Sequence, residues 1–253
     1  MIKSERLEKI TDYIKINTSA TIQELVEVLN VSHMTIRRDV KTLEEEEILN
    51  VIHGGVIYNA QHHSDDYKTI IARTSHLHEK EKIALQAITY IKPNDSIIID
   101  AGSTGELIAT FLPTNMPLTI VCYALNIATI IAKKPNCTLI LSGGHYHESS
   151  MSFESNEGLE LLKQNRVNIA FITANGVSST LGITCSAYFE RLIKHTALKS
   201  SKMSILVADS SKFDVIKPNH FANIEDFDII ITDKGLSEEC ASSIKGKTTL
   251  VVT

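Results

Sequence analysis

Neither a long apolar run nor a pattern of cysteines suited to cross-linking occurs in the 253 residues of this chain. No stretch approaches the roughly 18 uninterrupted apolar residues of a membrane helix, and no apolar run follows the charged N-terminus as it would in a secretory signal. The four cysteines are scattered and form no C-x-x-C pair, which argues against a disulfide framework or a structural zinc site. We therefore expect a protein of the reducing cytoplasm with no membrane partner.

An excess of basic charge is also absent. The formal net charge is −5 and the isoelectric point is near 6.1, so any contact with nucleic acid must come from a local patch. The chain has no internal repeat and changes character near Tyr58, where a polar stretch without apolar periodicity begins. We predict an N-terminal domain over residues 1–58, a linker over 59–72 and a larger domain over 73–253.

The larger domain shows short apolar runs that alternate with helical patterns. This alternation predicts an α/β fold with a mostly parallel sheet covered on both faces. We expect helices over 79–91, 106–111, 124–133, 188–200 and 237–244. The expected strands are Ser96–Asp100, Leu118–Tyr123, Thr138–Ser142, Ile169–Thr173, Met203–Ala208, Asp228–Thr232 and Thr248–Val252.

The N-terminal domain begins with three short helical patterns. The second opens with Thr21 and Glu24 at the spacing of a capping box, and Ser32 is placed to cap the third after a tight break. Two short helices joined by a few residues match a helix-turn-helix. Residues 48–58 alternate around a Gly-Gly turn, as a two-stranded wing does.

The third helix has the residues that DNA recognition requires. Ser32, His33, Thr35 and Arg37 lie at its N-terminal end, where base edges are met in a major groove about 12 Å wide. Arg38 and Lys41 lie where phosphates would be. The alternative is a small helical cap domain, because residues 1–60 hold seven Lys or Arg against ten Asp or Glu, a net of −3. The acidic run 44–47 would repel a phosphate backbone.

A family resemblance bears on this choice. The run Val31-Ser32-His33-Met34-Thr35-Ile36-Arg37-Arg38-Asp39-Val40, followed by His53-Gly54-Gly55, resembles the DNA-binding signature of the DeoR-type (GlpR-type) repressors. The resemblance implies that Thr35, Arg37 and Arg38 touch DNA and that the His-Gly-Gly run belongs to the wing. The family usually has a basic residue where this chain has Asn50, and often Gly where it has Glu47. We therefore expect modest affinity and strong salt sensitivity. The predicted DNA-binding residues are Ser32, His33, Thr35, Arg37, Arg38, Lys41, His53, Gly54 and Gly55.

In the larger domain, an apolar strand runs into the turn Asp100-Ala101-Gly102-Ser103-Thr104-Gly105 and then into a helix. Such a junction offers backbone amides and the positive end of a helix dipole to a phosphate. Polar loops also follow other strands, at 142–144, 173–176 and 209–213, and ligands of open parallel sheets bind at those strand ends. Ordinary turn chemistry remains the alternative, because Gly, Asn, Asp and Ser dominate turns.

The resemblance extends over this domain and implies an effector that is a phosphorylated sugar or a related metabolite. Three positions depart from the family pattern, which tends to have Asn, Gly and Asp where this chain has Tyr123, Ser155 and Asn175. The predicted effector-binding residues are Asp100, Gly102, Ser103, Thr104, Gly105, Tyr123, Gly143, Gly144, Asn175, Gly176, Glu190, Lys194 and Lys212.

The alternatives from other classes are an enzyme and a metal site. The fold implied by the resemblance is similar to that of ribose-5-phosphate isomerase and sugar-phosphate deaminases. However, aldose–ketose isomerisation needs a carboxylate base, and the corresponding turn holds the neutral Asn175. Glu190 and Lys194 fit either an acid–base pair or a surface i,i+4 ion pair. No third ligand is spaced to complete a metal shell with the histidines at 62–63, 76 and 78, or 145 and 147.

We thus predict a transcriptional repressor rather than an enzyme, without a cofactor or metal. We expect a homo-oligomer, a dimer or a tetramer, whose paired N-terminal modules bind repeated half-sites on duplex DNA.

Overall fold

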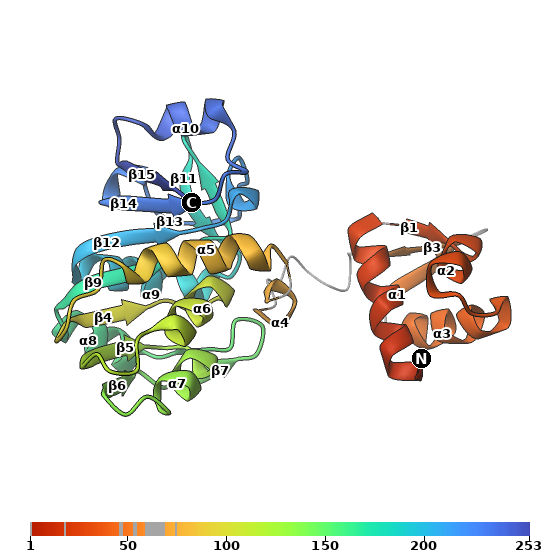
Figure 1. Ribbon diagram of the computed structural model, residues 1–253, viewed down its shortest axis with the longest axis horizontal. Coiled ribbons are helices and arrows are strands. Elements are labelled where there is room, and N and C mark those ends of the chain that lie inside the picture. Colours follow the sequence, from red (N-terminus) through yellow and green to blue (C-terminus); the bar gives the residue numbers. More distant parts are fainter. Residues whose placement is uncertain (1, 18, 46–47, 53–54, 59–68, 74) are drawn as a thin grey trace. The chain divides into compact units, whose positions relative to one another are not determined.

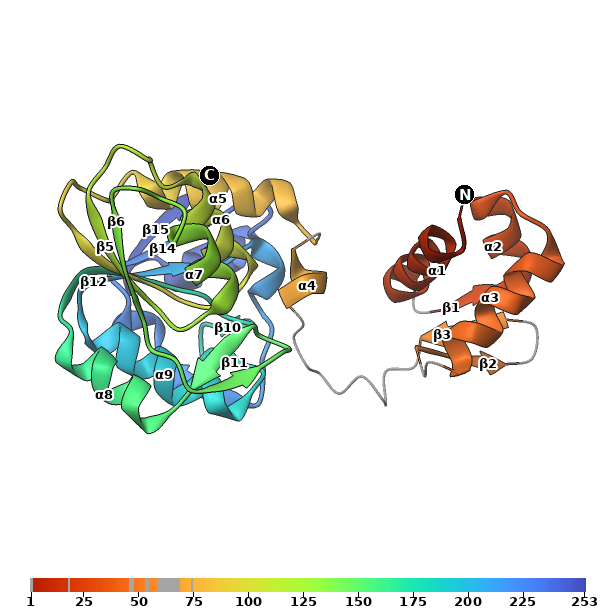
Figure 2. The ribbon, with the colours of Figure 1, turned by 90° about the horizontal axis from the view of Figure 1, so that it is seen from below.

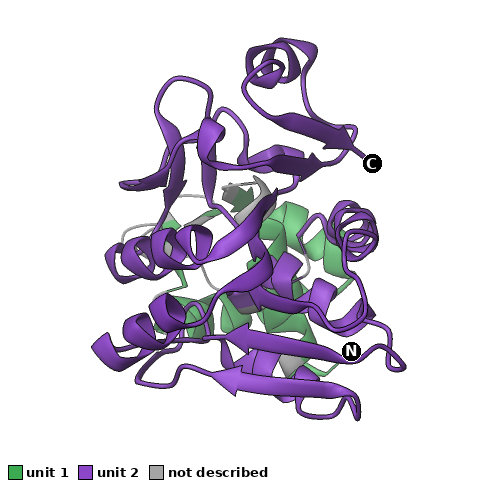
Figure 3. Ribbon diagram, turned by 90° about the vertical axis from the view of Figure 1, so that its left-hand side faces the viewer, with its two compact units in different colours: residues 1–66 green, residues 67–253 purple. Residues whose placement is uncertain are grey.

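The computed structural model describes residues 2–253 except residues 18, 46–47, 53–54, 59–68 and 74. The chain forms two compact units, residues 1–66 and residues 67–253 (Figure 3). Each has its own apolar core, the smaller built around Leu25, Ile36 and Leu43 and the larger around the apolar residues of a parallel sheet. None of the helices in the described residues is long and apolar enough to cross a membrane.

The N-terminal unit packs three helices against a small antiparallel sheet (Figure 1). The helices are α1 (Lys3–Asn17), α2 (Ile22–Leu29) and α3 (His33–Glu45). The predicted capping box at the start of α2 is present. The Thr21 hydroxyl accepts a hydrogen bond from the amide of Glu24, and the Glu24 carboxylate accepts one from the amide of Thr21. Asn30 then takes a left-handed conformation, φ 51°, which turns the chain sharply into α3.

The sheet of this unit has one strand more than the sequence predicted. β2 (Leu49–Ile52) and β3 (Gly55–Tyr58) pair as the expected wing, and β1 (Ser19–Thr21) adds to the other side of β3. A strand of three residues between two helices is too short to produce an alternating pattern, so its periodicity cannot be seen in the sequence. The two-stranded wing is therefore the outer part of a three-stranded sheet.

The C-terminal unit is built on a seven-stranded sheet in which all neighbours are parallel. Each of the seven predicted strands is present within one to two residues of its expected ends. In spatial order they are β15 (Thr249–Val252), β14 (Ile229–Thr232), β12 (Ser201–Val207), β9 (Val167–Ile172), β4 (Ser96–Ile99), β5 (Leu118–Cys122) and β6 (Cys137–Leu141).

Helices cover both faces of this sheet (Figure 2). On one side lie α5 (Leu77–Ile88), α6 (Ser103–Phe111) and α7 (Leu125–Ile131), and on the other lie α8 (Asn156–Gln164) and α9 (Tyr188–Lys199). The chain ends with α10 (Glu238–Ile244) before β15. The predicted fold class, a winged helix-turn-helix with a larger α/β domain, is confirmed.

The strand order places one junction at the centre of the sheet. From β4 the chain proceeds outward through β5 and β6, and it then returns to place β9 on the other side of β4. At such a switch point the loops after the two strands diverge, and the crevice between them is where open α/β sheets bind ligands. The loops in question begin at Asp100, after β4, and at Thr173, after β9.

Short elements outside the main sheet were not predicted. They include a second sheet, β10 (Gly176–Ser178), β11 (Gly182–Cys185) and β13 (Asn219–Ala222), and a hairpin, β7 (His145–His147) and β8 (Ser152–Glu154). The turn η1 (Ser210–Lys212) follows β12, and η2 (Ile224–Asp226) follows β13. Helix α8 was also missed. The predicted linker contains α4 (Thr69–Ala72), and its residues 59–68 lie outside the described part of the chain.

Candidate functional sites

Helix α3 separates its polar and apolar residues onto two faces. Ile36, Val40 and Leu43 are buried. Arg37 and Arg38 are fully on the outside of the unit, as are Ser32, His33 and Lys41, and Thr35 is half-buried. The Ser32 hydroxyl accepts from the amide of Thr35 at 3.3 Å, so it caps the helix. The face that the sequence assigned to DNA is therefore exposed and cationic.

A buried ion pair fixes α3 against α1, and the sequence analysis missed it. The Arg6 guanidinium donates to both carboxylate oxygens of Asp39, at 2.6 and 3.1 Å, and Asp39 is 1% exposed. Because the fork of a guanidinium matches a carboxylate, two such bonds set orientation as well as distance. Asp39 stands directly after Arg37 and Arg38, so the pair holds the helix that presents them. Its signal in the sequence is a carboxylate placed among the apolar residues of an amphipathic helix.

The wing is described only in part. His53 and Gly54 lie outside the described residues. Gly55 begins β3, and a Cβ on it would lie 2.5 Å from the carbonyl oxygen of Ala20 in β1. The close approach of two strands therefore accounts for this glycine without any ligand. Of the acidic run, Glu44 and Glu45 are exposed, and Lys41 lies 3.9 Å from Glu45.

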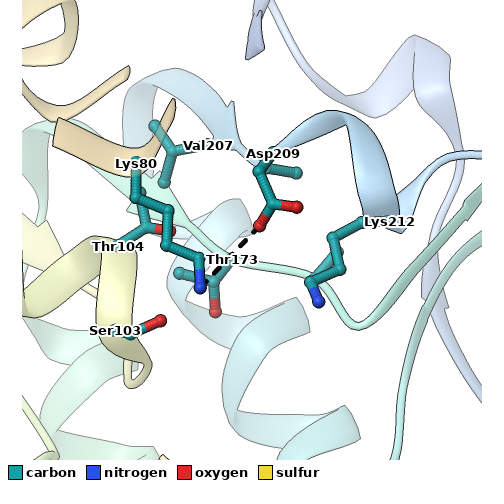
Figure 4. Close-up of a pocket in the computed structure, with 9 residues that line it drawn as sticks. Lys80, Ser103, Thr104, Thr173, Val207, Asp209 and Lys212 are labelled. Atoms are coloured by element: carbon teal, nitrogen blue, oxygen red, sulfur yellow. Dashed lines mark ion pairs between the residues drawn. The ribbon is translucent and has the colours of Figure 1, made fainter. Parts of the chain in front are cut away.

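In the C-terminal unit, a small pocket opens at the switch point of the sheet. It collects side chains from the first turn of α6, from the ends of β9 and β12, from η1 and from helix α5 (Figure 4). Its free space is about 10 Å³, room for one water, so a larger ligand enters only when the side chains that line it move apart. The lining residues are Lys80, Ser103, Thr104, Thr173, Ala174, Val207, Ala208, Asp209 and Lys212.

The N-terminus of α6 forms one wall of this pocket. Gly102 precedes the helix with φ 132°, a conformation that other residues rarely adopt. A Cβ on Gly105 would lie 2.3 Å from the carbonyl oxygen of Asp100, so only glycine allows the helix to start so close to β4. The first turn of a helix leaves backbone amides without intrahelical acceptors. With the hydroxyls of Ser103 and Thr104 beside them, these amides suit an anion.

Two lysines provide positive charge to the same pocket. Lys212 comes from η1, and Lys80 from α5 was not predicted. Lys80 is 2% exposed, its ammonium donates to the carbonyls of Ala72 and Ser75 at 2.7 Å each, and it lies 4.0 Å from the Asp209 carboxylate. Burial lowers the pKa of Lys80 to about 8, although the negative charge of Asp209 opposes that shift. Its signal in the sequence is a lysine on the apolar face that includes Ile83 and Ala84.

Beneath the pocket, four of the predicted effector residues form a buried polar cluster. Asp100 is 0% exposed. It accepts hydrogen bonds from the Tyr123 hydroxyl, from the Thr173 amide at 2.7 Å and from the Lys194 ammonium at 2.5 Å. Glu190 lies one turn before Lys194 on α9 and is also buried. The surface ion-pair alternative for Glu190 and Lys194 is wrong, because both side chains are in the interior.

The charges of this cluster shift one another. Burial raises the pKa of Tyr123 well above its ordinary value, and the adjacent Asp100 carboxylate raises it further. Burial also raises the pKa of Glu190, which Lys194 partly offsets. For Lys194, burial lowers the pKa, but Asp100 and Glu190 outweigh burial and hold the pKa above its ordinary value. Lys194 therefore supplies the positive charge that balances Asp100 beneath the pocket.

The remaining predicted residues lie away from the pocket lining. Gly143 and Gly144 follow β6, and the Gly143 carbonyl accepts from the Ser155 hydroxyl at 3.2 Å. Asn175 accepts from the Ser186 amide at 3.0 Å, so its side chain fixes a turn. A Cβ on Gly176 would lie 2.5 Å from the Val215 carbonyl oxygen, which explains that glycine by packing. The structure thus brings together the α6 residues and Lys212, but not these four.

Among the histidines considered as metal ligands, His147 has other partners. His147 pairs with Glu154 at 2.9 Å, and its ring stacks on Phe189 with 3.5 Å between centroids. His62 and His63 lie outside the described residues. In the described ranges, no group of three or more His, Cys, Asp or Glu residues is placed to hold a metal ion.

Comparison with known proteins assigns both units. The family model of the DeoR-like helix-turn-helix domain matches residues 6–62, and that of the DeoR C-terminal sensor domain matches residues 75–234. The HTH-type transcriptional regulator YulB of Bacillus subtilis is 32% identical over 98% of this chain and 95% of its own. The deoxyribose operon repressor of Escherichia coli K12 is 30% identical over 91% and 90%. A solved structure of ribose 5-phosphate isomerase A from Methanocaldococcus jannaschii covers 55% of each chain with 18% identity and a TM-score of 0.41.

Proposed function

This chain belongs to the DeoR family of DNA-binding transcriptional regulators, and from that premise we propose that a phosphorylated sugar or related metabolite controls it from the pocket at α6. The chain is a regulator with an N-terminal helix-turn-helix and a C-terminal sensor domain, not an enzyme.

The observation that carries the proposal is the convergence of two lysines on the first turn of a helix. Lys80 and Lys212 face that turn across a pocket that also holds the Ser103 and Thr104 hydroxyls (Figure 4). The Thr104 hydroxyl makes no hydrogen bond to any residue in the described ranges, so it remains available to a ligand. A phosphate dianion matches this set because it accepts several hydrogen bonds and gains from both cations and the helix dipole.

The rest of the ligand would lie toward Thr173 and Ala174, over the buried Asp100–Lys194 pair. Those groups are polar, and the charges of Asp100 and Lys194 balance each other. Such a surface suits the hydroxyls of a sugar better than a second charged group. One relative is named as the repressor of a deoxyribose operon. Pentose phosphates, including 2-deoxyribose 5-phosphate, are therefore the first candidates.

The DNA-binding arrangement we propose is an oligomer with paired N-terminal units. One recognition helix contacts only a few base pairs, so two copies on half-sites a helical turn or a multiple apart are needed for a specific operator. In the proposed contact, Arg37 and the N-terminal end of α3 meet base edges, while Arg38 and Lys41 neutralise phosphates. Light scattering of the purified chain distinguishes a dimer or tetramer from a monomer, and a monomer would contradict this arrangement.

Fluorescence anisotropy with the chain's own upstream DNA tests the sensor proposal. We expect at least one sugar phosphate to change the operator affinity, and its unphosphorylated sugar to have no effect at the same concentration. Lys212→Met should shift the response to higher ligand concentration. Lys163→Met, an equal charge change at an exposed position of α8, is the matched control. DNA binding that no phosphorylated sugar perturbs would contradict the sensor half of the proposal.

A further inference from the structure

One pocket residue also holds the segment that enters the C-terminal unit. The ammonium of Lys80 faces the pocket, yet its two hydrogen bonds go to the carbonyls of Ala72 and Ser75. Ala72 is the last residue of α4, the first described element of the C-terminal unit after the DNA-binding unit. Lys80 therefore contacts both the ligand pocket and the covalent route to the other unit.

Thr69 and Arg73 of the same segment also bond to residues of the C-terminal unit. The amide of Thr69 donates to the Ser149 carbonyl at 2.8 Å. The Arg73 guanidinium donates to Glu106 at 2.9 Å, and Glu106 lies in the first turn of α6, the helix whose N-terminus forms the pocket wall. Two independent contacts thus connect the segment to pocket elements, one through Lys80 and one through α6.

The ammonium of Lys80 has unused capacity. It carries three N–H donors, and two of them bond the carbonyls. The Asp209 carboxylate lies 4.0 Å from the ammonium, beyond hydrogen-bond distance. A phosphate in the pocket can accept from the third donor without displacing either carbonyl. Its negative charge would also favour the ammonium over the neutral amine, which burial makes easier to form by lowering the pKa of Lys80 to about 8.

We propose that Lys80 couples the pocket to α4: an anion bound at α6 completes the coordination of the ammonium and thereby fixes Ala72 and Ser75 on the C-terminal unit. Hydrogen bonds from a charged donor are stronger than those from a neutral one, so occupancy tightens the two carbonyl contacts. This inference rests on the proposed function of the pocket. It adds the route by which ligand binding affects residues outside the pocket. The ligand acts on the attachment point of the DNA-binding unit.

Hydrogen exchange on the full chain tests the coupling, with inorganic phosphate and 2-deoxyribose 5-phosphate as probes at saturating concentration. The amides of Thr69 and Arg73, which bond to Ser149 and Thr69, report on the segment. We expect them to exchange about tenfold more slowly in the bound protein, the effect of one strengthened charged hydrogen bond. Unchanged or faster exchange with a bound probe overturns the inference.

Variants separate coupling from binding. Lys80→Met should remove the slowing even where calorimetry shows that the probe is bound. Lys212→Met should weaken binding but retain the full slowing once saturated, because no hydrogen bond joins the Lys212 side chain to the described residues of the segment. Lys82→Met, on an exposed position of the same helix, should behave as the unmodified chain. A Lys80→Met protein that binds a probe and still shows the full slowing of amide exchange overturns the inference.

The two proposals fail differently. If calorimetry detects no binding of either probe or of other sugar phosphates, the proposed function falls and the coupling falls with it. If a probe binds and the Thr69 and Arg73 amides do not respond, the sensor proposal stands and the coupling through Lys80 is wrong.

Discussion

The two units of this protein hold their functional cations in opposite environments. On α3, Arg37 and Arg38 are exposed, while in the C-terminal unit Lys80 and Lys194 are each 2% exposed. An exposed cation keeps its hydration and exchanges partners at little cost, which suits a long polyanion met in many registers. A buried cation is held in place by fixed acceptors, which suits selection of one small anion.

The buried ion pairs of the two units also differ in what they support. In the N-terminal unit the buried Arg6–Asp39 pair lies behind the exposed cations and only orients them. In the C-terminal unit the buried pair of Asp100 and Lys194 lies next to the pocket itself. The comparison therefore predicts that charge changes in the first unit alter DNA affinity, whereas charge changes in the second alter stability and ligand choice.

The largest effect is expected from Lys194→Met. The substitution leaves the buried Asp100 carboxylate without its cation, which should cost about 3–5 kcal/mol of unfolding free energy. Urea unfolding of the full chain, followed by circular dichroism, measures the change. Lys163→Met removes an equal charge from an exposed pair with Glu160 and should cost less than about 1 kcal/mol. Equal losses in the two variants would show that burial does not distinguish these pairs.

The double substitution Arg37→Ala with Arg38→Ala is expected to weaken operator binding about 100-fold or more, since one base contact and one phosphate contact are lost. Stability should change little, because both side chains are exposed. Anisotropy with labelled operator measures the affinity, and the double substitution Lys82→Ala with Lys163→Ala, at two exposed positions of the C-terminal unit, serves as the control for net charge. Normal operator binding by the double variant would contradict the assignment of α3 to DNA.

The pocket should respond to pH in the range set by Lys80. The pKa of this lysine is about 8, so the free protein loses the cation as the pH rises above 8. A sugar phosphate is a dianion above its second pKa near 6, and its affinity should therefore be greatest between about pH 6 and 8 and fall up to about tenfold per unit above that. Calorimetry across this range measures the profile. In Lys80→Met the decline in affinity that starts near pH 8 should be absent. A decline that persists in this variant would show that another group titrates.

The smallest effect is expected in salt dependence. For a phosphate contact, removing one cation reduces the slope of log affinity against log salt by about 1. Arg38→Ala should show this change in an operator titration. Phosphate binding to the sensor pocket should vary less with salt, because buried groups are screened less than exposed ones. An equal salt slope at the two sites would remove the contrast between exposed and buried cations.

The sequence by itself determined the seven strands of the main sheet and the recognition helix. Apolar runs such as Ile97–Ile99 and the amphipathic spacing of Ile36, Val40 and Leu43 are local signals, because burial on one or two faces imposes its period directly on the chain. The Gly-rich turn after β4 was likewise visible. The conformation of this turn is fixed by steric contacts between residues close in sequence, such as the close approach of Gly105 to Asp100.

Tertiary structure alone decided which polar residues meet. Arg6 and Asp39 are 33 residues apart and Asp100 and Lys194 are 94 apart, so no local period connects either pair. The strand order brought Asp100 and Thr173 together at the switch point, left Gly143 and Gly144 elsewhere, and placed Lys80 against both the pocket and Ala72. Backbone preferences act over a few residues, whereas a buried charge finds its partner only when the sheet assembles.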